Sequence, residues 1–239
     1  SNPTPGYVSR VTSAFNNNGK GVRGDMKAVI RAILVDPEAR GDSKTDPRYG
    51  HLKEPVLYTM NVLRAMNGKT DGNVIRYFNL TMGQEAFTPP SVFNYYPPDY
   101  VLASEKISAP EFGIQNSSTA MLRINFAASM LFNRPAYYDA AQNKYITPLA
   151  DTITGTYRDS NFNGSIGTTI DWASWKPIAA DTTKLIEKIN ALMFHGSMST
   201  GMKTSLTKAV NAVAADDLLL RARTAVYLSV TSPQFQVER

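Results

Sequence analysis

The sequence predicts an all-α fold, an irregular bundle of seven or eight helices joined by one long aromatic-proline loop and one long polar loop. Two observations lead to this class. Apolar residues recur at a spacing of three and four along most of the 239-residue chain, which is the period of an amphipathic helix. Most of these stretches also begin at a residue that caps helices and end at Asn-Gly, Asp-Pro or Ser-Pro.

The first two predicted helices are short and begin at strong caps. Thr4 followed by Pro5 starts the first helix, which ends in the asparagines before Gly19. Asp25 caps the second helix, and Asp36 followed by proline stops it. The apolar residues that we expect on one face of this second helix are Met26, Val29, Ile30, Ile33 and Leu34.

Residues 19–24, between these two helices, match the pattern G-x-G-x-x-G of dinucleotide-binding loops. That pattern is meaningful only between a strand and a helix, whereas a helix is predicted before Gly19. We therefore expect a turn between helices, and we predict no cofactor.

Three helical segments are predicted in the middle of the chain. The first starts at Glu54-Pro55, with Val56, Leu57, Met60 and Leu63 expected to face inward. A shorter one covers residues 74–80. The longest is predicted to begin at Ser108 and to reach Phe132 as the central helix, with an apolar face made of Ile114, Met121, Ile124, Ala128 and Leu131.

The C-terminal third is predicted to be helical after a polar interruption. Residues 133–177 lose the helical period and are rich in Thr, Asn, Gly, Asp and Tyr, and one small hairpin is predicted over residues 145–157. Helices are then predicted to start at Asp181, at Ser199 and near Asp216. The last helix is expected to end before Ser232-Pro233.

The aromatic-proline loop, residues 87–100, contains five aromatic residues and two Pro-Pro pairs. Proline fixes φ and removes a backbone donor, so this segment is predicted to be stiff and irregular. One interpretation is a binding surface for sugars or an extended peptide, made by Phe93, Tyr95, Tyr96 and Tyr100. The other, which the sequence favours, is a structural strap, in which most of these four rings and Phe87 are buried against the helix after Ser108.

Candidate catalytic and metal residues are few. His51 lies in a charged loop, and Asp99 and Glu111 lie near the aromatic-proline loop, where a polymer-acting hydrolase could use them for acid-base chemistry. Asp159, Asn161 and Asn163 match the first ligands of a calcium loop. The twelfth position of that loop is Ile170 rather than a carboxylate, so a turn rich in Asn and Asp is the simpler interpretation and no metal is predicted.

The overall composition restricts the partners. The chain has 43% hydrophobic and 19% charged residues and no cysteine, which fits a globular protein and excludes disulfides and thiol chemistry. Its net charge of +5 is spread singly along the chain, so we expect no nucleic-acid partner. No apolar run approaches the ~20 residues of a membrane-spanning helix, so no membrane span is predicted.

Several segments resemble a bacterial domain-of-unknown-function family, the one numbered 1800. They are GDMKAVIRAILVDPEAR (residues 24–40), KEPVLYTMNVLRA (53–65), PPSVFNYYPPDY (89–100), SAPEFGI (108–114) and YLSVTSPQFQVER (227–239). Members of that family are usually longer and are often predicted to be exported. The resemblance implies that residues 1–239 form a single helical domain, the C-terminal portion of a longer chain, in an extracytoplasmic bacterial setting. It implies no reaction and no catalytic residues.

The sequence thus predicts a non-catalytic helical interaction module of an exported bacterial protein. Its expected partners are its own N-terminal half, a protein or a polysaccharide, contacted through loop surfaces. The alternative is a polymer-acting hydrolase whose acidic residues lie near the aromatic-proline loop.

Overall fold

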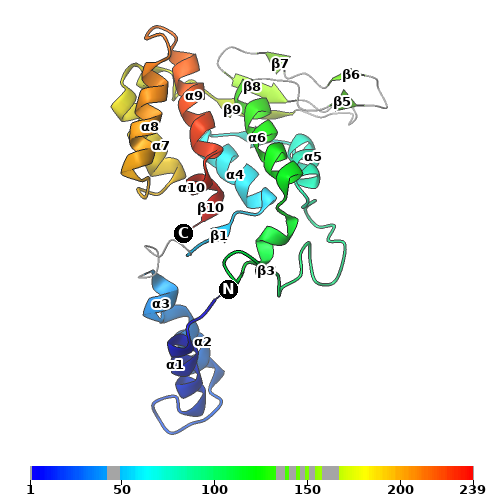
Figure 1. Cartoon of the computed structure of the whole chain (residues 1–239), viewed down its shortest axis with the longest axis vertical. Helices are drawn as coiled ribbons and strands as arrows, with labels where there is room; N and C mark the ends of the chain where they lie inside the picture. The colour runs from blue at the N-terminus through cyan, green and yellow to red at the C-terminus, as the bar shows by residue number, and fades with distance from the viewer. Residues whose placement is uncertain are drawn as a thin grey trace. The chain divides into compact units, whose positions relative to one another are not determined.

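The computed structural model describes residues 2–41, 49–132, 138–139, 144–145, 149–150, 154–157 and 167–238. The chain is mostly helical, as predicted (Figure 1). Its described residues form two compact units, unit 1 (residues 2–51 and 99–110) and unit 2 (residues 52–98 and 111–238). The single domain expected over residues 1–239 stays a prediction.

Unit 1 contains a helical hairpin and a small β-hairpin. Its elements are α1 (Pro5–Asn16), α2 (Met26–Val35), α3 (Pro37–Arg40), β3 (Val101–Leu102) and β4 (Ile107–Ser108). The predicted caps are confirmed, because Thr4 accepts a hydrogen bond from the Tyr7 N–H and Asp25 accepts from the backbone N–H groups of Lys27 and Ala28. The hairpin of α1 and α2 is the blue pair in Figure 1.

The glycine-rich segment between α1 and α2 is the predicted turn. The side-chain oxygen of Asn17 accepts hydrogen bonds from the backbone N–H groups of Gly19 and Gly21, each at 2.9 Å. Both glycines have positive φ, 88° and 78°, a conformation that a side chain disfavours. The pattern G-x-G-x-x-G here serves the chain reversal between two helices.

Unit 2 contains the larger helical bundle. Its helices are α4 (Pro55–Ala65), α5 (Asn73–Thr81), α6 (Ser117–Phe132), α7 (Thr182–Met193), α8 (Thr200–Asn211), α9 (Leu218–Val230) and α10 (Pro233–Gln236), with 3-10 helices η2 (Pro110–Ile114) and η3 (Pro177–Ala180). Figure 1 shows α7, α8 and α9 packed beside one another. In the described residues, eight α-helices are longer than the four residues of α3 and α10, so the expected number is confirmed.

The predicted start of the longest helix is wrong by nine positions, because α6 begins at Ser117 rather than at Ser108. Ser108 ends β4 instead, paired with Val101. The helix begins where Asn116 and Thr119 cap each other: each side-chain oxygen accepts the other residue's backbone N–H, at 2.8 and 2.9 Å. This reciprocal pair satisfies two free donors of the first turn.

The inward faces of two helices also differ from the prediction. On α6, Met121 is exposed, whereas Arg123 and Phe126 are buried. On α4, Leu57 is exposed and Tyr58 is buried. Each helix is therefore rotated so that a large aromatic or basic side chain enters the core. The cap of α9 is Asp217, one residue after the predicted Asp216.

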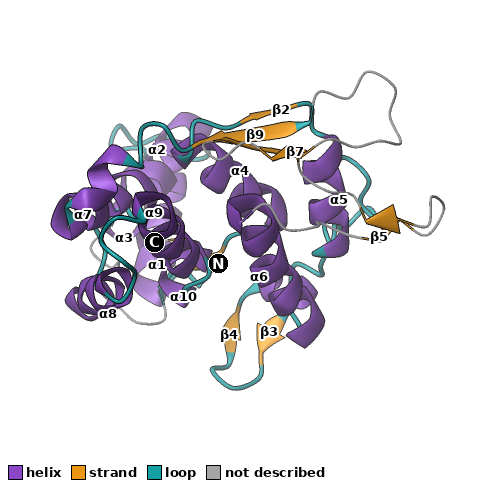
Figure 2. Cartoon of the chain, turned by 90° about the horizontal axis from the view of Figure 1, so that it is seen from above, coloured by secondary structure: helices purple, strands orange, loops and turns teal. Residues whose placement is uncertain are grey.

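A four-stranded antiparallel sheet lies in unit 2, in the order β2 (Lys69–Thr70), β9 (Thr168–Asp171), β8 (Thr154–Tyr157) and β7 (Leu149–Ala150). Figure 2 shows β2, β9 and β7 side by side. The pair β7–β8 confirms the predicted hairpin, with Leu149 opposite Thr156. The pairing of β2 with β9, Thr70 opposite Thr168, was not predicted. The remaining short strands are β1 (His51–Leu52), β5 (Tyr138–Asp139), β6 (Lys144–Tyr145) and β10 (Val237–Glu238).

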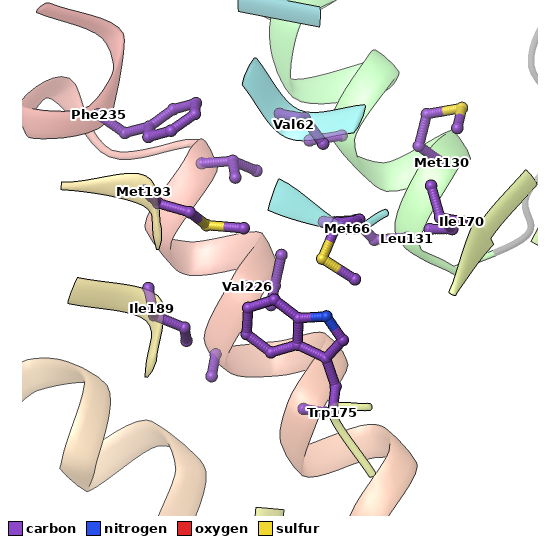
Figure 3. Packing of buried hydrophobic residues seen from close by; sticks show 14 of the residues in the cluster. Val62, Met66, Met130, Leu131, Ile170, Trp175, Ile189, Met193, Val226 and Phe235 are labelled. Atoms are coloured by element: carbon purple, nitrogen blue, oxygen red, sulfur yellow. The ribbon is translucent and has the colours of Figure 1, made fainter. Parts of the chain in front are cut away.

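One hydrophobic core fills unit 2 and joins its helices to β9. Figure 3 shows the Trp175 indole next to Val226 and Met66 within this core. Tyr58 contacts Phe126 edge to face, with ring centroids 5.6 Å apart. The turn after α4 requires Gly68, because a Cβ there would lie 2.8 Å from Cδ2 of Leu63. No helix in the described part of the chain is long and apolar enough to cross a membrane.

Candidate functional site

The aromatic-proline loop begins at Phe87, after α5 has ended at Thr81. Phe87 has a φ of +66° and Asn94 a φ of +73°. Asparagine tolerates this left-handed region, but a bulky residue such as phenylalanine is strained in it. Strain of this kind persists only where the surrounding chain imposes it, and it concentrates at functional segments.

Two tyrosine hydroxyls hold the base of the loop. The Tyr95 hydroxyl donates a hydrogen bond to the backbone oxygen of Glu85 and accepts one from the Thr88 N–H at 3.1 Å. The Tyr96 hydroxyl donates to the carboxylate of Glu54, at the start of α4. Both rings are half-buried. The base of the loop is therefore attached to the residues that directly precede it, through Tyr95. It is also attached to the start of α4 through Tyr96, which lies 42 positions after Glu54.

Glu54 is the centre of this attachment. Its second carboxylate oxygen accepts a hydrogen bond from the side-chain amide of Gln84, which is buried and whose own oxygen accepts the Val56 N–H at 3.3 Å. Glu54 makes no side-chain capping bond to α4. Both carboxylate oxygens of Glu54 therefore accept a hydrogen bond from another side chain, so Glu54 links the loop base to the start of α4.

The electrostatics keep Tyr96 protonated. Burial raises the pKa of Tyr96 well above its usual value, and the hydrogen bond to Glu54 and the charges of Glu54 and Glu111 raise it further. Tyr96 therefore keeps its proton and donates a hydrogen bond to Glu54 over the whole physiological pH range. The contact holds the loop and is unsuited to a tyrosinate nucleophile.

The tip of the loop presents apolar side chains to solvent. Ser91 and Asn94 close a turn, with the Asn94 N–H donating to the Ser91 oxygen at 3.1 Å. Val92 and Phe93, the two residues inside this turn, are 93% and 67% exposed. Phe87 is completely exposed, at 100%. We refer to Phe87, Val92 and Phe93 as the apolar tip.

The predicted strap is wrong, because Phe87 and Phe93 are exposed and the three tyrosines are only half-buried. The rings that pack on α6 come from other elements: Phe78 of α5 and Tyr58 of α4 both contact Phe126. The left-handed φ of Phe87 and the turn at Ser91–Asn94 keep the apolar tip out of the core.

The four predicted binding residues do not have one common role. Phe93 lies at the tip, and Tyr95 and Tyr96 form the base with their hydroxyls engaged. Tyr100 belongs to unit 1, where its backbone oxygen accepts the Ala109 N–H at 2.9 Å. Ligand binding by these residues stays a prediction. Glu54 and Gln84 were not predicted, because the position of Glu54 directly before Pro55 indicates only the start of a helix.

The predicted catalytic residues are dispersed over the two units. His51 and Asp99 are exposed in unit 1, whereas Glu111 is half-buried in the first turn of η2 in unit 2. Within the described ranges, no group of three or more His, Asp or Glu side chains could hold a metal ion. Asp159, Asn161 and Asn163 lie outside the described residues.

The fold and the loop define a mostly helical protein with a fixed apolar loop. Residues 1–237 match the model of a family described as "Protein of unknown function (DUF1800)". The chain therefore belongs to this family, in agreement with the resemblance of its segments. No curated protein and no solved structure matches the chain.

Proposed function

We propose that the chain is a non-catalytic interaction module that contacts a partner protein through the apolar tip. The observation that carries this proposal is the exposure of Phe87, Val92 and Phe93 on a loop whose base is attached by Tyr95 and Tyr96. An apolar side chain that is fully in water contributes nothing to folding, so its burial becomes favourable only in a complex.

The attachment of the base supports tight contact. A loop that is already fixed by hydrogen bonds and prolines loses little conformational entropy when it binds. Phenylalanine and valine bring no hydrogen-bonding groups, so an apolar pocket of a protein suits them better than the hydroxyl-rich surface of a polysaccharide. The export of this module from a bacterial cell is also our proposal, and it rests on the family resemblance.

The hydrolase alternative has one observation in its favour, the presence of two carboxylates, Glu54 and Glu111, near Tyr96. Glycosidases need two carboxyl groups that face one scissile bond. Glu54 is occupied by Tyr96 and Gln84, and its role is accounted for by that attachment. The hydrolase is therefore the weaker of the two candidate functions.

The test is selection of peptides from a displayed library by the full chain, beside a glycan array. The double variant Phe87→Ser/Phe93→Ser removes the tip, and Leu192→Ser changes an exposed apolar residue of α7 as a control. We expect wild type and Leu192→Ser to select the same peptides and the double variant to lose them. Peptide selection that survives in the double variant would refute the proposal, as would tip-dependent binding to glycans alone. Hydrolysis of a glycan that is lost in Glu111→Gln would support the alternative.

A further inference from the structure

Helix α2 of unit 1 exposes an apolar face that α1 does not cover. Met26, Ile30, Ile33 and Leu34 recur at helical spacing and form what we call the apolar stripe. Ile30 is 52% and Leu34 is 60% exposed, whereas Val29 is the one buried residue of this ten-residue helix. A helix with apolar residues on more than one side is typical of a helix buried in an assembly.

The helical hairpin, residues 2–41, has six basic and three acidic side chains, so its net charge is positive. Asp36 accepts two hydrogen bonds from Arg10, at 2.6 and 2.8 Å, and Glu38 accepts two from Thr4. Asp25 is occupied as the cap of α2 and by the Asn18 amide at 2.8 Å. The carboxylates of this helical hairpin are thus engaged internally.

Two basic residues run beside the stripe. Lys27 directly follows Met26, and Arg31 directly follows Ile30. Because Lys27 and Arg31 are four positions apart, they lie one turn apart on the same side of α2, in a row beside the stripe. Their side chains make no ion pair with the residues that the structure describes. An apolar stripe bordered by a row of positive charge is complementary to an amphipathic helix with carboxylates along one edge.

We propose that the apolar stripe is the docking site of an acidic amphipathic helix of a partner. Ten helical residues are about 15 Å long, which matches one helix-to-helix contact. The stripe consists of aliphatic side chains that interdigitate in helix packing, and it lacks the Trp and Tyr that characterise helices at a membrane interface. This site lies in unit 1 and is independent of the apolar tip, which lies in unit 2.

The experiment uses the full chain and two synthetic helical peptides of three heptads. One peptide carries Leu at positions a and d and Glu at e and g, and the other has Lys in place of Glu. Binding is measured by fluorescence anisotropy of the labelled peptides at low and physiological salt. We expect the glutamate peptide to bind at least tenfold more tightly than the lysine peptide, with a difference that shrinks as salt screens the charges.

Three variants locate the site. Ile30→Gln/Leu34→Gln replaces two of the four stripe residues and keeps good helix formers. It should weaken binding of the glutamate peptide by about tenfold or more without loss of helical circular dichroism. Lys27→Glu/Arg31→Glu should reverse the preference in favour of the lysine peptide. Leu192→Gln on α7 should change neither affinity.

Several results would overturn the proposal. These are equal affinity for both peptides, binding of neither, or binding that Ile30→Gln/Leu34→Gln leaves intact. Stripe-dependent binding to anionic lipid vesicles without peptide binding would assign the stripe to a membrane surface instead. A concentration-dependent dimer that the double variant abolishes, again without peptide binding, would assign it to a second copy of the chain.

Discussion

Helices α2 and α9 have similar apolar periodicity and opposite surroundings. Ala222, Val226 and Val230 of α9 are completely buried in the core of unit 2, whereas Ile30 and Leu34 of α2 are exposed. The helical hairpin of unit 1 is held instead by its polar contacts, above all Arg10 with Asp36. Periodicity shows that a helix has an apolar face, but it does not show that the same unit covers that face.

The largest expected effect comes from removing a core side chain of unit 2. Ile189→Ala on α7 should lower the free energy of unfolding by about 3 kcal/mol, because Ile189 is completely buried and its removal leaves a cavity. The matched change Ile30→Ala on α2 should cost only about 0.5 kcal/mol, because Ile30 is already 52% exposed.

Denaturant unfolding measures both variants. Tryptophan fluorescence reports on unit 2, which contains both tryptophans, Trp172 and Trp175, and far-ultraviolet circular dichroism reports on all helices. If Ile30→Ala and Ile189→Ala had equal costs, the contrast between the two helices would not hold in solution.

Replacing each of two buried arginines of unit 2 by methionine should change the free energy of unfolding in opposite directions. Arg221 donates to the backbone oxygens of Ala179, Val210 and Val213 and to the hydroxyl of Thr182, so Arg221→Met should cost about 3 kcal/mol by leaving these acceptors without a donor.

Arg123 is also completely buried, but its guanidinium nitrogens have no hydrogen-bond partner in the part of the chain that the structure describes. Burial disfavours the charged guanidinium and so lowers the pKa of Arg123. Arg123→Met should therefore raise the free energy of unfolding by about 1 kcal/mol, as measured by urea denaturation. A loss as large as that of Arg221→Met would mean that Arg123 has a partner in solution.

Acid should weaken the hairpin of unit 1 through Asp36 and Glu38. The hydrogen bonds from Arg10 lower the pKa of Asp36, and those from Thr4 lower the pKa of Glu38, below their usual values near 4. A lowered folded-state pKa stabilises the fold above the unfolded pKa, and this contribution disappears as the pH falls through the folded value.

Helical circular dichroism between pH 6 and pH 2 should therefore show a decrease below about pH 4 that is smaller in Asp36→Asn. Asp216→Asn, at an exposed position outside the hairpin, serves as a control. An identical acid transition in wild type and Asp36→Asn would exclude this carboxylate as its source.

A small effect on stability is expected from a change at Phe87 in the apolar tip. Phe87→Asn places a residue that tolerates positive φ where phenylalanine is strained, so it should raise the free energy of unfolding by up to about 1 kcal/mol. Thermal unfolding would detect the change as a slightly higher midpoint. A clearly lower midpoint would show that the Phe87 ring stabilises the folded chain.

The helix starts could be predicted from the sequence because a cap is a local interaction. Thr4, Asp25, Asp181 and Ser199 each accept a backbone N–H two or three positions later, within the window that a sequence pattern covers. The start of α6 was missed because the sequence around Ser108 offers an equally good local signal. The pairing of Ser108 in β4 overrides it.

The candidate site was less predictable because its contacts are distant in sequence. The composition of the aromatic-proline loop indicated stiffness correctly, but not which rings face solvent. That depends on the φ of Phe87 and on the bond from Tyr96 to Glu54, 42 positions earlier. No local pattern marks a glutamate before a proline as the acceptor for a tyrosine of another segment.

The sheet of unit 2 has a consequence for the order of folding. The hydroxyls of Thr70 and Thr168 lie 2.8 Å apart across β2 and β9, although these residues are 98 positions apart. Closing so long a loop costs chain entropy before any contact compensates for it, whereas α7, α8 and α9 are neighbours along the chain. We therefore expect the C-terminal helices to associate early and the β2–β9 pair to form among the last steps, so that this pair limits the rate at which unit 2 reaches its native state.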